Sequence, residues 1–141
     1  MRRYQVIGFC ALLALLWSAP RLKAQITGQV VATIHHKFTI VNTTLPPGKY
    51  TFRMLGGTEL TEMQVSSADG NTLELFLVNE AEAPKVPSRS ELIFNRYGKD
   101  EYLEKVFEAG SRMGVSVAEP SRAELREQRK GHHPVTHSEE Q

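Results

Sequence analysis

Hydrophobic and polar residues alternate with a period of two along most of the chain between residues 27 and 117. This period is typical of β-strands that bury one face, because successive side chains point to opposite sides of a strand. The clearest example is the segment 73–78, in which leucines occupy every second position and Glu74, Phe76 and Val78 lie between and after them. The pattern therefore predicts an all-β domain.

Turn-forming residues divide this pattern, and the strongest of them form a proline-glycine corner, Leu45-Pro46-Pro47-Gly48-Lys49-Tyr50-Thr51-Phe52-Arg53. Its prolines fix φ and lack an amide donor, and its glycine permits backbone angles that side chains disfavour. Asp-Gly within 68–71 and the glycine within 98–100 indicate further turns. The expected strands cover residues 27–41, with a bulge or bend near His35-His36, and then 50–55, 60–66, 73–78, 91–97, 102–107 and 115–117. Six to seven strands predict an antiparallel sandwich or a small barrel within residues 25–119.

The C-terminal part of the chain has a different pattern. Ser121 and Glu124 have the spacing of a capping box, which predicts a short helix over residues 120–130. The tail 131–141, GHHPVTHSEEQ, has no core-forming pattern, and we expect it to be disordered. Residues 79–89 are polar and contain two prolines, which is typical of an exposed loop.

The N-terminal residues 1–24 have the layout of a secretory signal peptide. Arg2 and Arg3 precede an uncharged apolar run from 6 to 17, and Ala24 is the best position for cleavage. The run is shorter than the roughly 20 residues that a spanning helix needs, so no membrane span is expected after cleavage, with an uncleaved anchor as the alternative. We therefore expect export to the periplasm or the extracellular space.

Removal of the signal peptide changes the charge and the cysteine content. The remaining 117 residues carry 13 Lys and Arg against 16 Asp and Glu, a net charge of −3. This balance gives no electrostatic support for nucleic-acid binding. The single cysteine, Cys10, leaves with the signal peptide, so the exported domain is expected to fold without a disulfide.

Histidines are the first candidates for a metal site. His35 and His36 are neighbours on an expected strand, so their side chains point to opposite faces and do not easily share one ion. His132, His133 and His137 lie in the tail, where flexible imidazoles bind Zn²⁺ or Cu²⁺ weakly. The plainer interpretation is a solvated tail without a metal, and no cofactor is expected.

Other candidate chemistry is sparse. Arg96 lies next to Tyr97 in an expected hairpin, where it either satisfies backbone groups or a carboxylate such as Asp69, or contacts a ligand together with Tyr97. Three carboxylates along the following strand are interpreted as its solvated face: Glu101, Glu104 and Glu108. A nucleophile elbow, a phosphate loop and a zincin motif are all missing, so we do not expect an enzyme.

Four motifs occur in the same order as in a family of small exported all-β proteins abundant in acidobacterial genomes. The family pattern reads IPFDFTVGNKTLPAGEYTV, SADG, FHRYG and SRAE, and the matching segments here are 34–51, 67–70, 93–98 and 121–124. The chain resembles this family over nearly its whole exported length, but has His35-His36-Lys37 for Pro-Phe-Asp and Asn95 for a histidine. The resemblance implies export and fold, and it implies no activity. The corner is also similar to those of prealbumin-like and adhesin sandwiches.

These observations lead to a functional expectation and two alternatives. We expect an exported, non-enzymatic β-module of the envelope or periplasm that acts through contacts with an envelope protein or a glycan. One alternative is a carrier that holds a small apolar ligand in the barrel interior, which requires a cavity. The other is a hydrolase, which requires a polar cluster with converging titratable groups.

Overall fold

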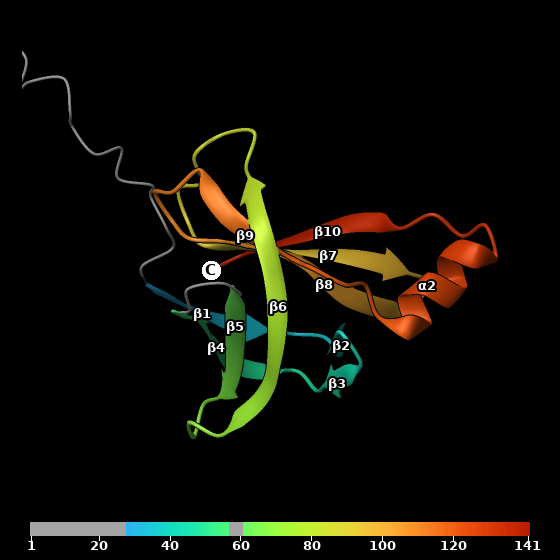
Figure 1. Ribbon diagram of the computed structural model, residues 1–141, viewed down its shortest axis with the longest axis horizontal. Helices are drawn as coiled ribbons and strands as arrows, with labels where there is room; N and C mark the ends of the chain where they lie inside the picture. The colour runs from blue at the N-terminus through green and yellow to red at the C-terminus, as the bar shows by residue number, and fades with distance from the viewer. Residues whose placement is uncertain (1–27, 57–60) are drawn as a thin grey trace, which may run out of the picture.

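The structure is a computed structural model that describes residues 28–56 and 61–141, and the signal peptide expected at residues 1–24 lies outside the described residues (Figure 1). Ten strands and, within the described residues, one helix are present. The strands are β1 Gln29–Ile34, β2 Phe38–Ile40, β3 Thr43–Leu45, β4 Gly48–Leu55, β5 Glu62–Ser67, β6 Thr72–Glu82, β7 Glu91–Tyr97, β8 Asp100–Phe107, β9 Met113–Val117 and β10 Val135–Glu140; the helix is α2 Arg122–Arg129.

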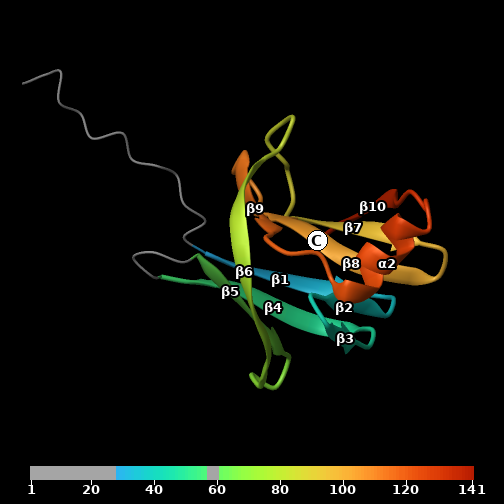
Figure 2. The same ribbon diagram turned by 45° about the vertical axis from the view of Figure 1, so that its right-hand side comes forward.

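The ten strands form one mixed sheet that does not close into a barrel. The order is β1-β4-β5-β6-β9-β8-β2-β3, and β7 pairs with both β8 and β10. The long strand β6 pairs with β5 through its first part and with β9 through its last part, so it joins the two halves of the sheet (Figures 1 and 2). The predicted all-β class with a short C-terminal helix is confirmed.

One strand pair is parallel, which the expected antiparallel topology did not include. The predicted bend near the histidine pair is present, because β1 ends at Ile34 and β2 begins at Phe38. Before the bend, β1 pairs with β4 in an antiparallel register. After the bend, β2 pairs with β8 in a parallel register, with Thr39 opposite Tyr102. Residues 35–37 therefore cross between the two halves of the sheet.

The core lies between the inner faces of the two halves. Every second residue of β1 is buried, as the period-two pattern predicts. Four phenylalanines are at most 2% exposed, and they come from both halves: Phe38, Phe52, Phe94 and Phe107. Burial of each such side chain stabilises the fold by about 1.5–3 kcal/mol. This continuous core provides a rigid frame for the polar groups at its edge.

The proline-glycine corner connects β3 to β4 as expected. The Tyr50 hydroxyl donates a hydrogen bond of 2.5 Å to the carbonyl oxygen of Pro46, which closes the corner. The other predicted turns are also present, and both use a glycine with positive φ, Gly70 (φ +85°) and Gly98 (φ +63°). These hairpins set the register of β5 with β6 and of β7 with β8.

The helix α2 has the predicted capping box and a defined end. The Ser121 hydroxyl oxygen accepts a hydrogen bond of 2.9 Å from the Glu124 amide. At the other end, Gly131 (φ +79°) donates to the carbonyl of Gln128, and His132 donates to the carbonyl of Glu127, which is a Schellman motif. None of the helices in the described residues has the length and apolarity needed to cross a membrane.

Two expectations about loops are wrong. The tail 131–141 is not disordered, because β10 pairs antiparallel with β7 along six residues, from Val135 opposite Arg96 to Glu140 opposite Glu91. A weak local pattern is sufficient there, since the edge of β7 offers a row of backbone donors and acceptors. The loop expected at 79–89 is shorter, because β6 continues to Glu82 in its pairing with β9.

Candidate metal centre

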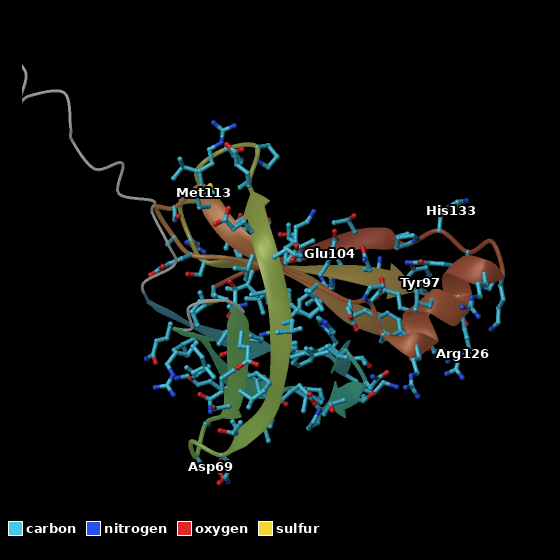
Figure 3. The ribbon with its side chains drawn as sticks, viewed as in Figure 1. Asp69, Tyr97, Glu104, Met113, Arg126 and His133 are labelled. Carbon is cyan, nitrogen blue, oxygen red and sulfur yellow. The ribbon has the colours of Figure 1, made fainter. Side chains whose placement is uncertain are left out.

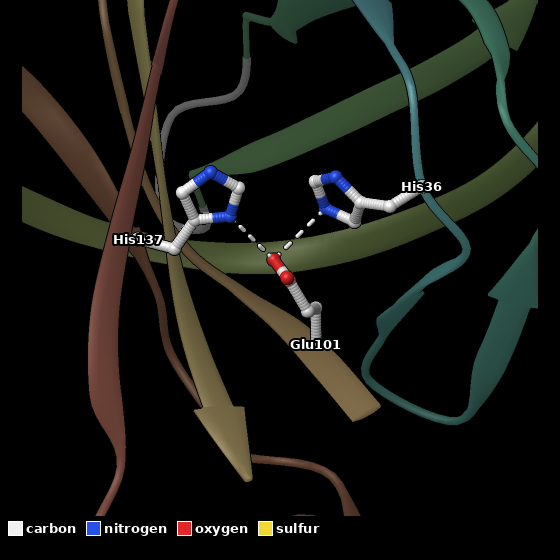
Figure 4. Close-up of side chains that lie close together, drawn as sticks. All are labelled: His36, Glu101 and His137. Atoms are coloured by element: carbon white, nitrogen blue, oxygen red, sulfur yellow. Dashed lines mark hydrogen bonds and ion pairs between the residues drawn. The ribbon is translucent and has the colours of Figure 1, made fainter. Parts of the chain in front are cut away.

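Three residues that are far apart in the sequence meet at one point between the two halves of the sheet (Figure 4). His36 lies in the bend between β1 and β2, Glu101 lies near the start of β8, and His137 lies in β10. Each offers one possible ligand atom, and these atoms all lie within 4.8 Å of one another. We call these three residues the His–Glu–His cluster.

Both imidazoles approach the same carboxylate oxygen. The distance from His137 Nδ1 to Glu101 Oε2 is 2.8 Å, and the distance from His36 Nε2 to the same oxygen is 2.9 Å. The first contact is a well-aligned hydrogen bond. The second is short but poorly aligned, so that His36 Nε2 is a buried nitrogen without a hydrogen-bond partner.

A second carboxylate lies on the other side of His36. Its Nδ1 is 3.0 Å from Oε1 of Glu139, which occupies the position two residues after His137 on β10 and therefore faces the same way. A neutral imidazole carries only one N–H group, and a carboxylate oxygen can only accept. If Nδ1 carries the N–H group and faces Glu139, the lone pair of Nε2 faces the carboxylate of Glu101 and is available to bind a cation.

The two imidazole rings of the cluster pack against the ring of Phe94. The ring of Phe94 meets that of His36 edge-on at a centroid distance of 4.9 Å and lies 6.2 Å from that of His137. Glu101 is only 7% exposed, although the two histidines remain partly accessible. Few water molecules can solvate a carboxylate in this position, so its charge requires neighbouring donors or a cation.

The interpretation of Glu101 as part of a solvated strand face is wrong. Its strand begins beside the bend at His36, and β10 covers it from the other side. Arg96 adds a loose ion pair, with 4.0 Å between its Nη1 and Glu101 Oε1. The burial therefore comes from two segments that are distant in sequence, which the local pattern could not show.

Arg96 and Tyr97, the two residues suggested as a ligand pair, have different surroundings in the structure. Arg96 is exposed and approaches Glu101. Asp69, the carboxylate suggested as a partner of Arg96, contacts Ser67 at the tip of the β5–β6 hairpin, far from the neighbouring Tyr97 (Figure 3). Tyr97 is buried, and its hydroxyl accepts a hydrogen bond of 3.2 Å from Gln128 of α2. Tyr97 therefore anchors the helix.

The tail histidines do not form one group. His132 Nδ1 lies 2.6 Å from Glu127 Oε2 on the surface of α2, and His133 is exposed on the loop between α2 and β10 (Figure 3). Only His137 joins the cluster, and its partners come from outside the tail. His35 is exposed, as expected for a neighbour that points away from His36.

Sequence reasoning missed His36 and Glu139 as site residues, although each carried a signal. His36 shares the parity of Ile34 and Phe38, which are buried, so it is a polar residue on an apolar face. Glu139 shares the parity of His137 in β10. Comparison of the chain with protein-family models, with curated proteins and with solved structures gives no match.

Proposed function

We propose that this protein is an exported β-domain that binds one divalent transition-metal ion at His36, Glu101 and His137. The observation that carries the proposal is the convergence of two imidazole nitrogens on one buried carboxylate oxygen, with His36 Nε2 left without a hydrogen-bond partner. Two histidines and one glutamate are a known ligand set for Zn²⁺, which leaves the fourth position of the ion to water or to another ligand. The signal-peptide pattern of residues 1–24 supports export to the periplasm or beyond.

The three possible ligand atoms lie within 4.8 Å of one another, so the side chains must rotate to take up an ion. Zinc bonds to histidine nitrogen and carboxylate oxygen are about 2.0–2.2 Å long, which places tetrahedral donors roughly 3.3–3.6 Å apart. Glu101 Oε2 is now 2.9 Å and 2.8 Å from the two nitrogens. The contact of His36 Nδ1 with Glu139 supplies the outer carboxylate that typically orients a metal-bound histidine.

The proposed role of the ion is structural. It would connect the β1–β2 bend, β8 and β10, and thereby hold the C-terminal strand against the body of the sheet. A ligand that binds only the folded state adds to its stability by mass action. In this proposal the domain acts in the envelope or periplasm through surface contacts with a protein or a glycan, and it is not an enzyme. The apolar-ligand carrier has no specific observation in its favour.

The test is Zn²⁺ titration of the full chain, expressed with its own signal sequence, recovered after export and treated with a chelator. Isothermal calorimetry is expected to show one site. Zn²⁺ at 100 times the dissociation constant is expected to stabilise the fold by about 2.7 kcal/mol, or roughly 10 °C in the melting temperature. His36→Gln and His137→Gln are expected to abolish both effects. Cu²⁺ is expected to bind at the same site and Ca²⁺, which prefers oxygen ligands, is not.

The matched controls are His35→Gln and His133→Gln, because these histidines are exposed and lie outside the cluster. Both are expected to bind Zn²⁺ as the unsubstituted protein does. If the protein takes up no Zn²⁺, the three side chains of the cluster are held together by hydrogen bonds without a metal, and the proposal is overturned. Loss of binding in His133→Gln, with binding retained in His36→Gln, would move the site to the tail and overturn the proposal.

A further inference from the structure

A polar pocket lies on the surface between the β2–β3 hairpin, the start of β8 and the first turns of α2. Its volume is about 410 Å³, within the ~300–1,000 Å³ range of small-molecule sites. Alternation along β8 places Asp100 and Tyr102 on the opposite side of the strand from the Glu101 carboxylate. Glu101 also lines the pocket, so the pocket borders the His–Glu–His cluster, but the binding of a small molecule there goes beyond the proposed function.

The positive charge of the pocket comes from three side chains. Lys37 is 3.6 Å from Asp100, and both are well exposed, so this pair contributes little net charge. Arg122 and Arg126 line the pocket one helical turn apart, and among the described residues neither forms an ion pair. Arg122 also occupies the first turn of α2, where the helix dipole favours an anion and disfavours a cation.

A buried tyrosine gives the second observation. Tyr102 lines the pocket and is only 5% exposed, and its hydroxyl has no hydrogen-bond partner among the described residues. The hydroxyl is not one of the buried polar atoms that lack a partner, so it is open to solvent and is free to donate to a ligand in the pocket.

The rest of the lining offers hydroxyl and amide groups. The hydroxyls of Thr39 and Thr44 are 3.0 Å apart on adjacent strands, and both residues line the pocket together with Asn42. Such groups can donate to and accept from the hydroxyls of a ligand. We infer that the pocket binds a small, hydroxyl-rich anion of the sugar-acid class, with its carboxylate against Arg122 and Arg126 and its hydroxyls against the threonines and Tyr102.

The test is calorimetric titration of the chelator-treated full chain with D-glucuronate, D-glucose and inorganic phosphate. Glucuronate is expected to bind at least tenfold more tightly than glucose, which lacks the charge, and than phosphate, which lacks the hydroxyl-bearing ring. Arg126→Gln is expected to weaken glucuronate binding at least tenfold, because hydrogen bonds to charged groups contribute about 1.5–3 kcal/mol. Tyr102→Phe, which keeps the buried ring, is expected to weaken it to a smaller degree.

Arg129→Gln is the matched control, because Arg129 is an exposed arginine of the same helix that does not line the pocket. It is expected to leave the affinity unchanged. Failure of glucuronate to bind, or equal affinity in Arg126→Gln, would overturn the inference. Phosphate binding as tight as that of glucuronate would overturn the sugar-acid class, and equal binding of glucose would overturn the role of the arginines.

Discussion

Two buried glutamates lie on opposite sides of the β7–β8 hairpin, and their surroundings differ. Glu124 of α2 is 5% exposed, and its carboxylate accepts a hydrogen bond of 2.9 Å from the Asn95 amide and another from the Ser121 backbone. Glu101 of β8 is 7% exposed, but its close neighbours are His36, His137 and, more loosely, Arg96. The two glutamates are thus similarly buried, but the groups around their carboxylates differ in chemical type.

The neighbours of each carboxylate explain the difference. Glu124 is paired with neutral donors that have one fixed role, and it completes the capping box of the helix. The neighbours of Glu101 are imidazoles, which can carry a proton or bind a metal, and one of them retains an unpaired buried nitrogen. Burial of a carboxylate therefore does not by itself indicate a functional site, whereas unpaired ligand atoms around it do.

The largest expected effect comes from the same substitution at both positions. Glu101→Gln removes the charged ligand, and we expect the affinity for Zn²⁺ to fall by at least about 100-fold, beyond the ~10–100-fold typical of an outer-sphere partner. Glu124→Gln is expected to leave Zn²⁺ affinity unchanged, because Glu124 lies on the α2 side of the hairpin. Calorimetric titration of both variants measures the difference. If both variants lost Zn²⁺ affinity equally, the different surroundings of the two carboxylates would have no bearing on metal binding.

A smaller effect is expected at the outer carboxylate of the cluster. Glu139→Gln keeps an oxygen that can accept from His36 Nδ1, now 3.0 Å away, but removes the charge that favours an N–H at this position. We expect Zn²⁺ affinity to fall by roughly tenfold, the lower end for second-sphere partners. Glu140→Gln is the control, because Glu140 is the exposed neighbour on the same strand. An unchanged affinity in Glu139→Gln would mean that Glu139 does not orient His36.

The fold was largely predictable from the sequence because it rests on local signals. The period-two alternation, the Asp-Gly turn closed by Gly70, and the Ser121 capping box all depend on residues close together in the chain. The signals were weakest where tertiary contacts decide the structure. The strand β10 exists because the edge of β7 is available, and β2 pairs with β8 because the chain bends at residues 35–37.

The candidate site was less predictable for the same reason. The expectation that His35 and His36 point to opposite faces of a strand removed the pair as a chelate, but it did not exclude His36 with other partners. Glu101 and His137 are 36 positions apart, and no local pattern relates them. His36 is the residue that brings an imidazole against the ring of Phe94, and only the bend between β1 and β2 places it there.

The smallest expected effect is a pH dependence of stability that belongs to Glu124. Burial, with a further contribution from the charge of Glu104, raises the pKa of Glu124 above its ordinary value of 4.5, although the hydrogen bonds from Asn95 and Ser121 oppose the shift. The folded state therefore holds this proton to higher pH than the unfolded state does. Its contribution to stability is fully present below pH 4.5 and is lost as the pH rises through the folded pKa.

Glu124→Gln cannot titrate, and its side-chain oxygen can still accept from Asn95, now at 2.9 Å. We therefore expect the free energy of unfolding of the variant, minus that of the unsubstituted protein, to increase as the pH rises above 4.5. Urea denaturation at a series of pH values, with a chelator present so that the His–Glu–His cluster is metal-free, measures this difference. All other titrating groups are common to both proteins and cancel to first order. A difference that stays flat or decreases with rising pH would show that hydrogen bonding at Glu124 outweighs its burial.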